Sequence, residues 1–454
     1  MTPRPAMPEA HALRQPDTLI HARWIADVDT CTLLAQHAVA VRAGRIVDIL
    51  PSALARERYT PHDNVELGTH LLIPGLINLH THAAMSLMRG LADDLPLKTW
   101  LEQHIWPAEA THVSSQFVRD GTRLACAEML KSGITCFNDM YFFPDAAAAA
   151  VAETGMRAVL GIIAIDFPSR YASDIEDYLT KGLAICERWQ HDPRIHFSLA
   201  PHAPYTVGDS GFERIRTLAA QLELPIHLHI HETREELESH RARYGCSPLY
   251  RLERLGLLGP QTIGVHGVHV DAADLERLAR HGCHIAHCPT SNLKLASGIA
   301  PITAMLELGI NVGLGSDGAA SNNRLDLLQE MRLASLLAKG VSGHADSIPA
   351  WEALRMATLH GAKALGLETE IGSIRIGKLA DLCAIDMERL ELAPCFDPIS
   401  HLVHCVSRDD VSHVWVEGKC CVSDRILTQI DVASLKNSAR LWQNRIRSSL
   451  KIVS

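Results

Sequence analysis

The chain has 454 residues, 52 acidic and 43 basic side chains, and a formal net charge of −9. This length suits a large domain with a smaller companion, and the acidic balance without a basic run argues against nucleic acid or an anionic membrane surface as partner. We expect a cytoplasmic protein, because no segment is apolar over the roughly 20 residues of a membrane span and the N-terminus lacks a secretory pattern. The twelve scattered cysteines contain no CxxC pair, which excludes a disulfide framework and a thiolate zinc site.

Both ends of the chain predict β-structure. Residues 1–15 read as a disordered tail, and apolar and polar residues alternate in TLIHARWIAD and HAVAVRAGRIVDIL, which is typical of short strands. The same pattern returns in GSIRIGKLADLCAID (372–386) and SHVWVEGKCCV (412–422). We expect residues 16–70 and 365–425 to form one small β-sandwich domain built from both termini, and residues 426–454 to form a helical tail.

The middle of the chain, residues 71–364, predicts a different architecture. Helical patterns such as FVRDGTRLACAEMLKSG and FERIRTLAAQLEL lie between apolar, strand-like runs. Strands alternating with helices predict a parallel, TIM-type (β/α)8 barrel, and runs that are almost wholly apolar fit strands buried on both faces. The eight runs are 71–80, 134–140, 157–166, 195–203, 226–232, 262–268, 284–289 and 311–317.

The first run ends in His80-Thr81-His82. Alternate residues of a strand share a face, so both imidazoles can reach one ion. They also lie at the carboxyl end of a barrel strand, where active sites of this architecture collect. In a chain with 26 histidines, one such pair is weak evidence by itself.

Further ligand-type residues recur at later strand ends, and in a barrel these ends meet at one mouth. They are His202, His229 with its neighbours His227, His231 and Glu232, then His266 and Asp317. Imidazole and carboxylate suit zinc, and the set His80, His82, His229 and Asp317 fits a catalytic ion that keeps a place for water. The run 195–203 contains no lysine, which in carboxylated form bridges two metals in related barrels, and its absence favours a single ion.

The chain resembles the amidohydrolase superfamily, and within it the 5′-methylthioadenosine/S-adenosylhomocysteine deaminases. The resemblance covers nearly the whole chain. The motifs that carry it are PGLINLHTHAAMSLMRGLADDLPLKTWL, FNDMYF, PHAPYT, HIHET, VHGVHV, SNLKLASGIAP and GSDGAASNN. HxH marks the superfamily, whereas the first long motif, SNLKL and SDGAASNN are more specific to this group.

The resemblance implies a role for each matching residue. The metal ligands would be His80, His82, His229 and Asp317, and they would hold one divalent ion, Zn2+ by family expectation. Glu232 would shuttle a proton to the purine ring, and His266 would polarise the attacking hydroxide. Glu232 and Asp317 would also contact the substrate. We expect His227 and His231 to have only a core or solvent-shell role.

Substrate binding is implied for Glu109, which would hold the ribose hydroxyls, for His202, and for Trp100 beside base and sugar. A helix-terminal acid and core packing remain the alternatives for Glu109 and Trp100. Where some members of the group carry an arginine for the homocysteine carboxylate, this chain has Ile162, and Arg170 is our candidate to replace it. This departure favours methylthioadenosine over S-adenosylhomocysteine.

The implied activity is hydrolytic deamination at C6 of 5′-methylthioadenosine, S-adenosylhomocysteine or adenosine, releasing ammonia and the inosine analogue. The alternative is a related deaminase or dechlorinase acting on guanine-like bases or s-triazines, which would use the same metal set. A ribose-binding Glu109 would distinguish the two. The resemblance also implies a small-molecule nucleoside as the partner and a homo-oligomer.

Overall fold

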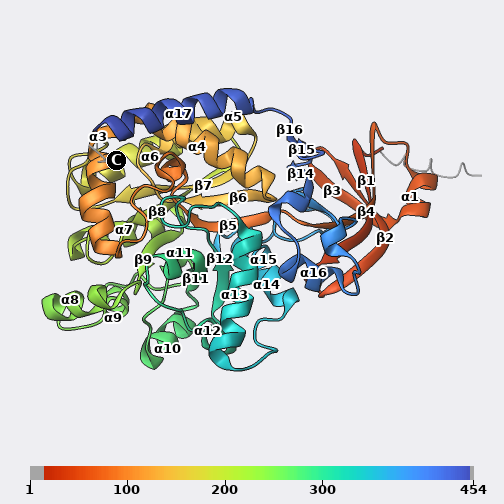
Figure 1. Ribbon diagram of the computed structural model, residues 1–454. Helices are drawn as coiled ribbons and strands as arrows, with labels where there is room; N and C mark the ends of the chain where they lie inside the picture. The colour runs from red at the N-terminus through yellow and green to blue at the C-terminus, as the bar shows by residue number, and fades with distance from the viewer. Residues whose placement is uncertain (1–14, 450–454) are drawn as a thin grey trace, which may run out of the picture.

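The computed structural model describes residues 15–449, in which two eight-stranded sheets lie side by side (Figure 1). One sheet is the barrel and the other comes from both ends of the chain. The tail predicted at 1–15 falls almost entirely outside the described residues, as do the last five residues of the predicted helical tail. No helix within 15–449 has the length and apolar character needed to cross a membrane.

The barrel sheet is wholly parallel, and its strands follow one another in chain order, which confirms the predicted fold class. Polar contacts close the ring between its first and last strands. The Asp317 amide donates to the His80 carbonyl over 3.0 Å, and the Ser316 amide donates to Asn78 Oδ1 over 2.8 Å. The strands are β5 (Leu76–Thr81), β6 (Ile134–Asp139), β7 (Arg157–Ala164), β8 (Ile195–Pro201), β9 (Ile226–Ile230), β10 (Thr262–His266), β11 (His284–His287) and β12 (Asn311–Leu314).

Helices connect successive barrel strands and cover their outer faces (Figure 1). Both helical patterns noted in the sequence form helices, at α4 and α7, and α7 ends before Pro225. The barrel helices are α4 (Ser115–Lys131), α5 (Pro144–Thr154), α6 (Ile175–Trp189), α7 (Asp209–Leu222), α8 (Arg234–Tyr244), α9 (Pro248–Arg254), α10 (Ala272–His281), α11 (Pro289–Lys294), α12 (Ile302–Glu307), α13 (Leu327–Ser342), α14 (Ala350–Met356) and α15 (Leu359–Ala364).

The second sheet joins the two ends of the chain through one antiparallel pair, β4 with β13. Its order is β16-β15-β14-β13-β4-β1-β2-β3. Side chains from six of these strands, among them Ile20, Val39, Leu382 and Trp415, share one apolar core, so the sheet curls over its own face. The strands are β1 (Thr18–Asp27), β2 (Thr32–Arg42), β3 (Arg45–Pro51), β4 (Asp63–Pro74), β13 (Leu382–Asp386), β14 (Val411–Val416), β15 (Lys419–Ser423) and β16 (Ile426–Leu427), with α1 (Ser52–Arg58), η3 (Leu390–Leu392), α16 (Pro398–His404) and η4 (Arg408–Asp410) beside them.

The single strand predicted at 71–80 is wrong, because β4 of the terminal sheet continues to Pro74 and β5 of the barrel begins at Leu76. The residue between them must be glycine. A Cβ on Gly75 would lie 2.1 Å from Thr135 Oγ1, far inside van der Waals contact. The apolar run therefore crosses from one sheet to the other, and our division of the chain at residues 70 and 71 stays a prediction.

A segment that precedes α4 covers one side of the barrel mouth. It contains η1 (Ala83–Met88), α2 (Leu97–Trp100), the π-turn η2 (Leu101–Ile105) and α3 (Trp106–His112). The C-terminal helix α17 (Val432–Ser449) lies along α4 (Figure 1), where the Trp442 indole donates to Asp120 over 2.9 Å and packs on Phe117. Its last described residue, Ser449, is 2.5 Å from the His112 ring, so α17 also supports α3.

Candidate active site

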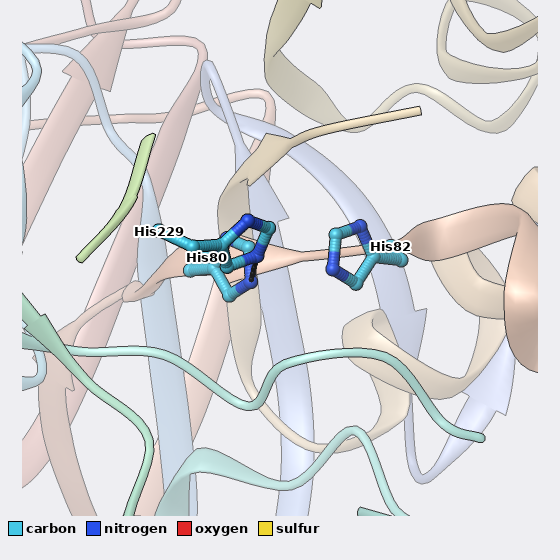
Figure 2. Close-up of side chains that lie close together, drawn as sticks. All are labelled: His80, His82 and His229. Atoms are coloured by element: carbon cyan, nitrogen blue, oxygen red, sulfur yellow. Dashed lines mark hydrogen bonds between the residues drawn. The ribbon is translucent and has the colours of Figure 1, made fainter. Parts of the chain in front are cut away.

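Three histidines from two strand ends point their rings toward one another at the mouth of the barrel (Figure 2). His80 and His82 come from the end of β5, and His229 comes from β9. The Nε2 atoms of His80 and His229 lie 3.3 Å apart. Asp317, after β12, places Oδ1 3.2 Å from Nε2 of His80 and 3.3 Å from Nε2 of His82. The four ligands predicted from the sequence thus form one cluster.

The second nitrogen of each ring has a partner of its own. Nδ1 of His82 lies 2.6 Å from the Met140 carbonyl, and Nδ1 of His229 lies 2.8 Å from the His202 carbonyl. Both Nδ1 atoms must carry the proton, because a carbonyl only accepts. Burial also lowers the pKa of His80 to about 4 and that of His229 well below its usual value. Neutral rings with free Nε2 lone pairs are the form that binds a metal ion.

Asp317 is held in a backbone conformation that non-glycine residues rarely adopt, with φ at +60°. Its Oδ2 accepts hydrogen bonds from the hydroxyls of Ser291 at 2.6 Å and Ser321 at 2.8 Å. Oδ1, which accepts from the Gly318 amide, faces the histidines. Three imidazole nitrogens and one fixed carboxylate oxygen within reach of a common point are a donor set that fits a divalent ion such as zinc.

Glu232 and His266 lie beside this cluster. Oε2 of Glu232 is 3.7 Å from Nε2 of His266, and Ser297 donates to Oε1 over 3.2 Å. Nδ1 of His266 lies 2.8 Å from Oδ1 of Asn292, which fixes the ring and turns Nε2 to the site. Burial raises the pKa of Glu232 above its usual value, with His266 opposing and the charge of Asp317 adding to the shift. A carboxyl group whose pKa is raised in this way holds its proton more readily than a free glutamate, which suits it to act as an acid.

A cavity of about 490 Å³ opens onto the cluster, and all the predicted site residues except His80 line it. His80 is fully buried beneath it. Most of the remaining wall is apolar and comes from the segment before α4 and from the loops after β6 and β7, with Met85, Leu97, Ile105, Phe142, Ile163, Phe167 and Leu295 among its residues. A cavity with apolar walls and a few convergent polar groups is typical of a small-molecule site.

Glu109 on α3 faces this cavity and accepts a hydrogen bond from the Tyr141 hydroxyl over 2.7 Å. Burial raises its pKa to about 7, although the bond from Tyr141 acts in the opposite direction. Trp100 is buried against the cavity and donates its indole N–H to the Leu91 carbonyl over 3.3 Å.

Arg170 lies on the cavity wall, but its guanidinium is already engaged. Its NH1 group donates to the carbonyls of Ala110 and Thr111, at 3.3 and 3.0 Å, which are at the end of α3. A cation at a helix C-terminus is favourable because the last carbonyls have no partner within the helix. Arg170 therefore fastens the helix that carries Glu109.

Sequence reasoning missed the residues that hold the ligands in place. His227, expected to be only a core or solvent-shell residue, has its Nε2 3.0 Å from Nδ1 of His80. Tyr141, Asn292 and Ser321 were also not singled out. Tyr141 lies in the motif FNDMYF, Asn292 in SNLKL and Ser321 in SDGAASNN. The motifs that carried the resemblance thus contain these residues, but nothing in the sequence assigned them a role.

Comparison with known proteins agrees with this geometry. The model of the amidohydrolase family matches residues 71–421, which include the whole barrel. The chain belongs to the amidohydrolase family. It is 47% identical over 433 residues to a protein of Saccharophagus degradans named 5-methylthioadenosine/S-adenosylhomocysteine deaminase, covering 95% of this chain and 97% of the relative. A protein of the same name from Teredinibacter turnerae is 46% identical over 95% of this chain and 98% of its own length.

Among solved structures, this amidohydrolase is similar to an adenosine deaminase of Xanthomonas campestris that was crystallised with bound zinc. The two chains are 46% identical and superpose with a TM-score of 0.94, over 96% of this chain and 99% of the other. Both sheets therefore have counterparts in a solved relative.

Proposed function

We propose that this amidohydrolase is a metal-dependent deaminase that replaces the C6 amino group of 5′-methylthioadenosine or S-adenosylhomocysteine with oxygen and releases ammonia. The names of its relatives support this reaction. The observation that carries it is the position of Glu232: a buried carboxyl group with a raised pKa borders both the ligand cluster and the cavity. Hydrolytic deamination needs an acid at that place, beside the nucleophile and facing the base.

The metal ion would be held by His80, His82, His229 and Asp317, and the zinc of the Xanthomonas relative supports Zn2+ as its identity. When bound, such an ion makes hydroxide available near neutral pH by lowering the pKa of water from 15.7 to about 7.

The protein residues would move the protons. Asp317 accepts the proton that water gives up, and His266 orients the nucleophile through Nε2 while Asn292 fixes its other nitrogen. Glu232 donates its proton to N1 of the purine as a bond forms at C6, which removes the charge that would otherwise develop on the ring. Asp317 then gives the proton it took from water to the amino group, which leaves as ammonia, and the hydroxyl proton at C6 returns to Glu232, so that the 6-oxo nucleoside forms and both carboxyl groups regain their starting states. Each positioned acid or base contributes roughly 10²–10⁴-fold.

The outer part of the cavity would hold the sugar and its 5′ substituent. We assign the ribose hydroxyls to Glu109, whose second oxygen is available while Tyr141 occupies the first. His202 and Trp100 would contact the bound nucleoside, and apolar walls around Ile163 and Phe167 suit a thioether. Since the base and triazine substrates of the alternative reading have no ribose, the placement of Glu109 in the cavity favours a nucleoside.

The test is a comparison of substrates on the purified, zinc-loaded protein. Methylthioadenosine, S-adenosylhomocysteine, adenosine and guanine are incubated in parallel, and ultraviolet absorbance and ammonia are followed. Loss of the adenine band with equimolar ammonia on methylthioadenosine is the expected result. Turnover of guanine alone would instead assign the protein to the deaminases that act on guanine-like bases. The cytoplasmic location, the absence of nucleic-acid binding and the homo-oligomeric state stay predictions.

A further inference from the structure

Glu330 on α13 is a buried carboxylate that the reaction as described above does not use. It is 1% exposed, and both of its oxygens accept hydrogen bonds. Oε2 accepts from the Thr290 amide over 3.0 Å, and Oε1 accepts from Nδ2 of Asn322 over 2.8 Å. Within residues 15–449 no cation pairs with this carboxylate. An unpaired buried carboxylate is costly to stability, which suggests that these contacts serve another purpose.

The two groups that Glu330 binds belong to α11 and to the turn after β12, which both hold the carboxylate of Asp317. Thr290 immediately precedes Ser291, and Asn322 immediately follows Ser321. These are the serines whose hydroxyls bind Oδ2 of Asp317, at 2.6 and 2.8 Å. Each of the two residues that Glu330 binds is thus the sequence neighbour of a serine that holds the carboxylate of Asp317.

Asn322 adds a third connection on the backbone of the same loop. Its Nδ2 donates to Glu330 and also to the carbonyl of Ser316, over 2.6 Å. Ser316 is the residue before Asp317, whose φ of +60° is strained for a residue with a side chain. Such a conformation persists only where the surroundings impose it.

We propose that Glu330 is a positioning residue that orients Asp317 through Ser291 and Ser321 and through the backbone at Ser316. The inference rests on the proposed role of Asp317 as metal ligand and proton acceptor. Glu330 does not line the cavity, so a substrate bound there would not reach it. Its carboxylate joins the first turn of α11 to the turn after β12, so that Oδ1 of Asp317 faces the histidines while Oδ2 is held by the serines.

The first test is Glu330→Gln in the zinc-loaded protein. Glutamine has the same size, but at about pH 8, where Glu330 is ionised, one of the two acceptors is replaced by an NH2 group that faces a donor. We expect kcat to fall about 10–100-fold and the affinity for zinc, measured by competition with a chelator, to fall by a similar factor, as for other residues that orient metal ligands. KM should change little, because the walls of the cavity remain.

A double-mutant cycle distinguishes positioning from a general structural role. Ser291→Ala and Ser321→Ala together remove the bonds through which Glu330 acts on the side chain of Asp317. In that background Glu330→Gln should cause a much smaller further loss of kcat and zinc affinity than in the wild type, because residues in one network are not additive. If Glu330→Gln fails to fold, Asn322→Ser removes the same clamp from the other side and should give the same pattern.

Asp326→Ala is the matched control. Asp326 caps the same end of α13 by accepting from the Gln329 amide over 3.3 Å, and among residues 15–449 no hydrogen bond or ion pair joins it to Thr290, Ser321 or Asp317. This variant should lower the thermal midpoint and leave kcat and zinc affinity unchanged. A Glu330→Gln variant that behaves like this control, or a loss that is fully additive with the serine substitutions, would overturn the proposal. If the wild type deaminates no nucleoside, the proposed function fails, but zinc affinity still tests the role of Glu330.

Discussion

Nε2 of His227 lies 3.0 Å from Nδ1 of His80, so one buried histidine fixes the ring of another. His80 must place Nε2 toward Asp317 and His229, and the hydrogen bond at Nδ1 selects that tautomer and that ring orientation. His227 remains neutral because burial lowers its pKa well below the usual value. It is therefore an acceptor for the Nδ1–H of His80.

His227→Phe should reduce zinc affinity and kcat together, by about 10–100-fold, because the ring of His80 loses the hydrogen bond that holds its Nδ1. His227→Gln, whose carbonyl can accept the same hydrogen bond, should recover a large part of both. Bound zinc after dialysis and initial rates of ammonia release measure the two effects. Equal losses in the two variants would mean that packing, rather than the hydrogen bond, is what His227 contributes.

Glu232→Gln should keep its zinc and lose most turnover, about 10²–10⁴-fold, since the ligands are intact and the proton donor is gone. Metal content and kcat on methylthioadenosine are measured on the same preparation. Glu235→Gln is the matched control from the same segment. Glu235 is exposed and pairs with Lys98 across the mouth, so its loss should change kcat less than about twofold. Loss of zinc from Glu232→Gln would show that Glu232 is a ligand instead.

The sequence predicted that the four candidate ligands lie together but not which residues support them, and the reason is physical. His80, His82, His229 and Asp317 lie at strand ends, where the alternation of a strand and the convergence of a barrel predict proximity. Glu330 acts on Asp317 through α11 and the turn after β12, which only the folded chain brings together. Such a contact leaves no periodic pattern in the sequence. The run 71–80 was misread for a related reason: one apolar stretch serves two sheets, and only the contact of Gly75 with Thr135 reveals the break.

Arg170→Met tests whether this side chain binds substrate or supports α3. Because its guanidinium donates to the carbonyls of Ala110 and Thr111 and is exposed to solvent, α3 and Glu109 lose support worth about one ordinary hydrogen bond. We therefore expect KM to rise by a similar factor, about 3–10-fold, for methylthioadenosine and S-adenosylhomocysteine. Steady-state kinetics on both substrates decide between the roles. A loss confined to S-adenosylhomocysteine would show that Arg170 binds the homocysteine carboxylate.

Glu330 also predicts a dependence of stability on pH. Burial raises its pKa to about 7, so in the folded chain it stays protonated where an unfolded chain has already released the proton. Its contribution to the free energy of unfolding is therefore complete below the ordinary pKa of a glutamate and is lost as the pH rises toward 7. In metal-free protein, the free energy of unfolding of the wild type should fall relative to Glu330→Gln between about pH 5 and 7, by at most about 1.4 kcal/mol per pH unit. Urea denaturation at several pH values measures the difference, and a constant difference would contradict the raised pKa.

A buried ion pair fastens the barrel to the terminal sheet. Arg157, at the start of β7, donates from Nε to Asp381 over 2.9 Å and from NH2 over 3.3 Å, and both side chains are 2% exposed. Asp381, just before β13, also accepts from the Glu417 amide over 2.7 Å, and its carbonyl accepts from Gly75 at the crossing between the sheets. One residue thus connects the barrel and the turn after β14 through its carboxylate, and the β4–β5 junction through its backbone carbonyl.

Asp381→Ala should lower the free energy of unfolding by about 3–5 kcal/mol, because it leaves the guanidinium of Arg157 buried without its counter-charge. Glu153→Ala, which removes the exposed partner of Arg119 on the barrel surface, should cost less than about 1 kcal/mol. Denaturant unfolding measures both, and kcat of the folded fraction should remain that of the wild type, since Asp381 lies outside the walls of the cavity. A loss for Asp381→Ala no larger than for Glu153→Ala would mean that water reaches Arg157 once the carboxylate is gone, and that the junction of the two sheets depends on its backbone pairing instead.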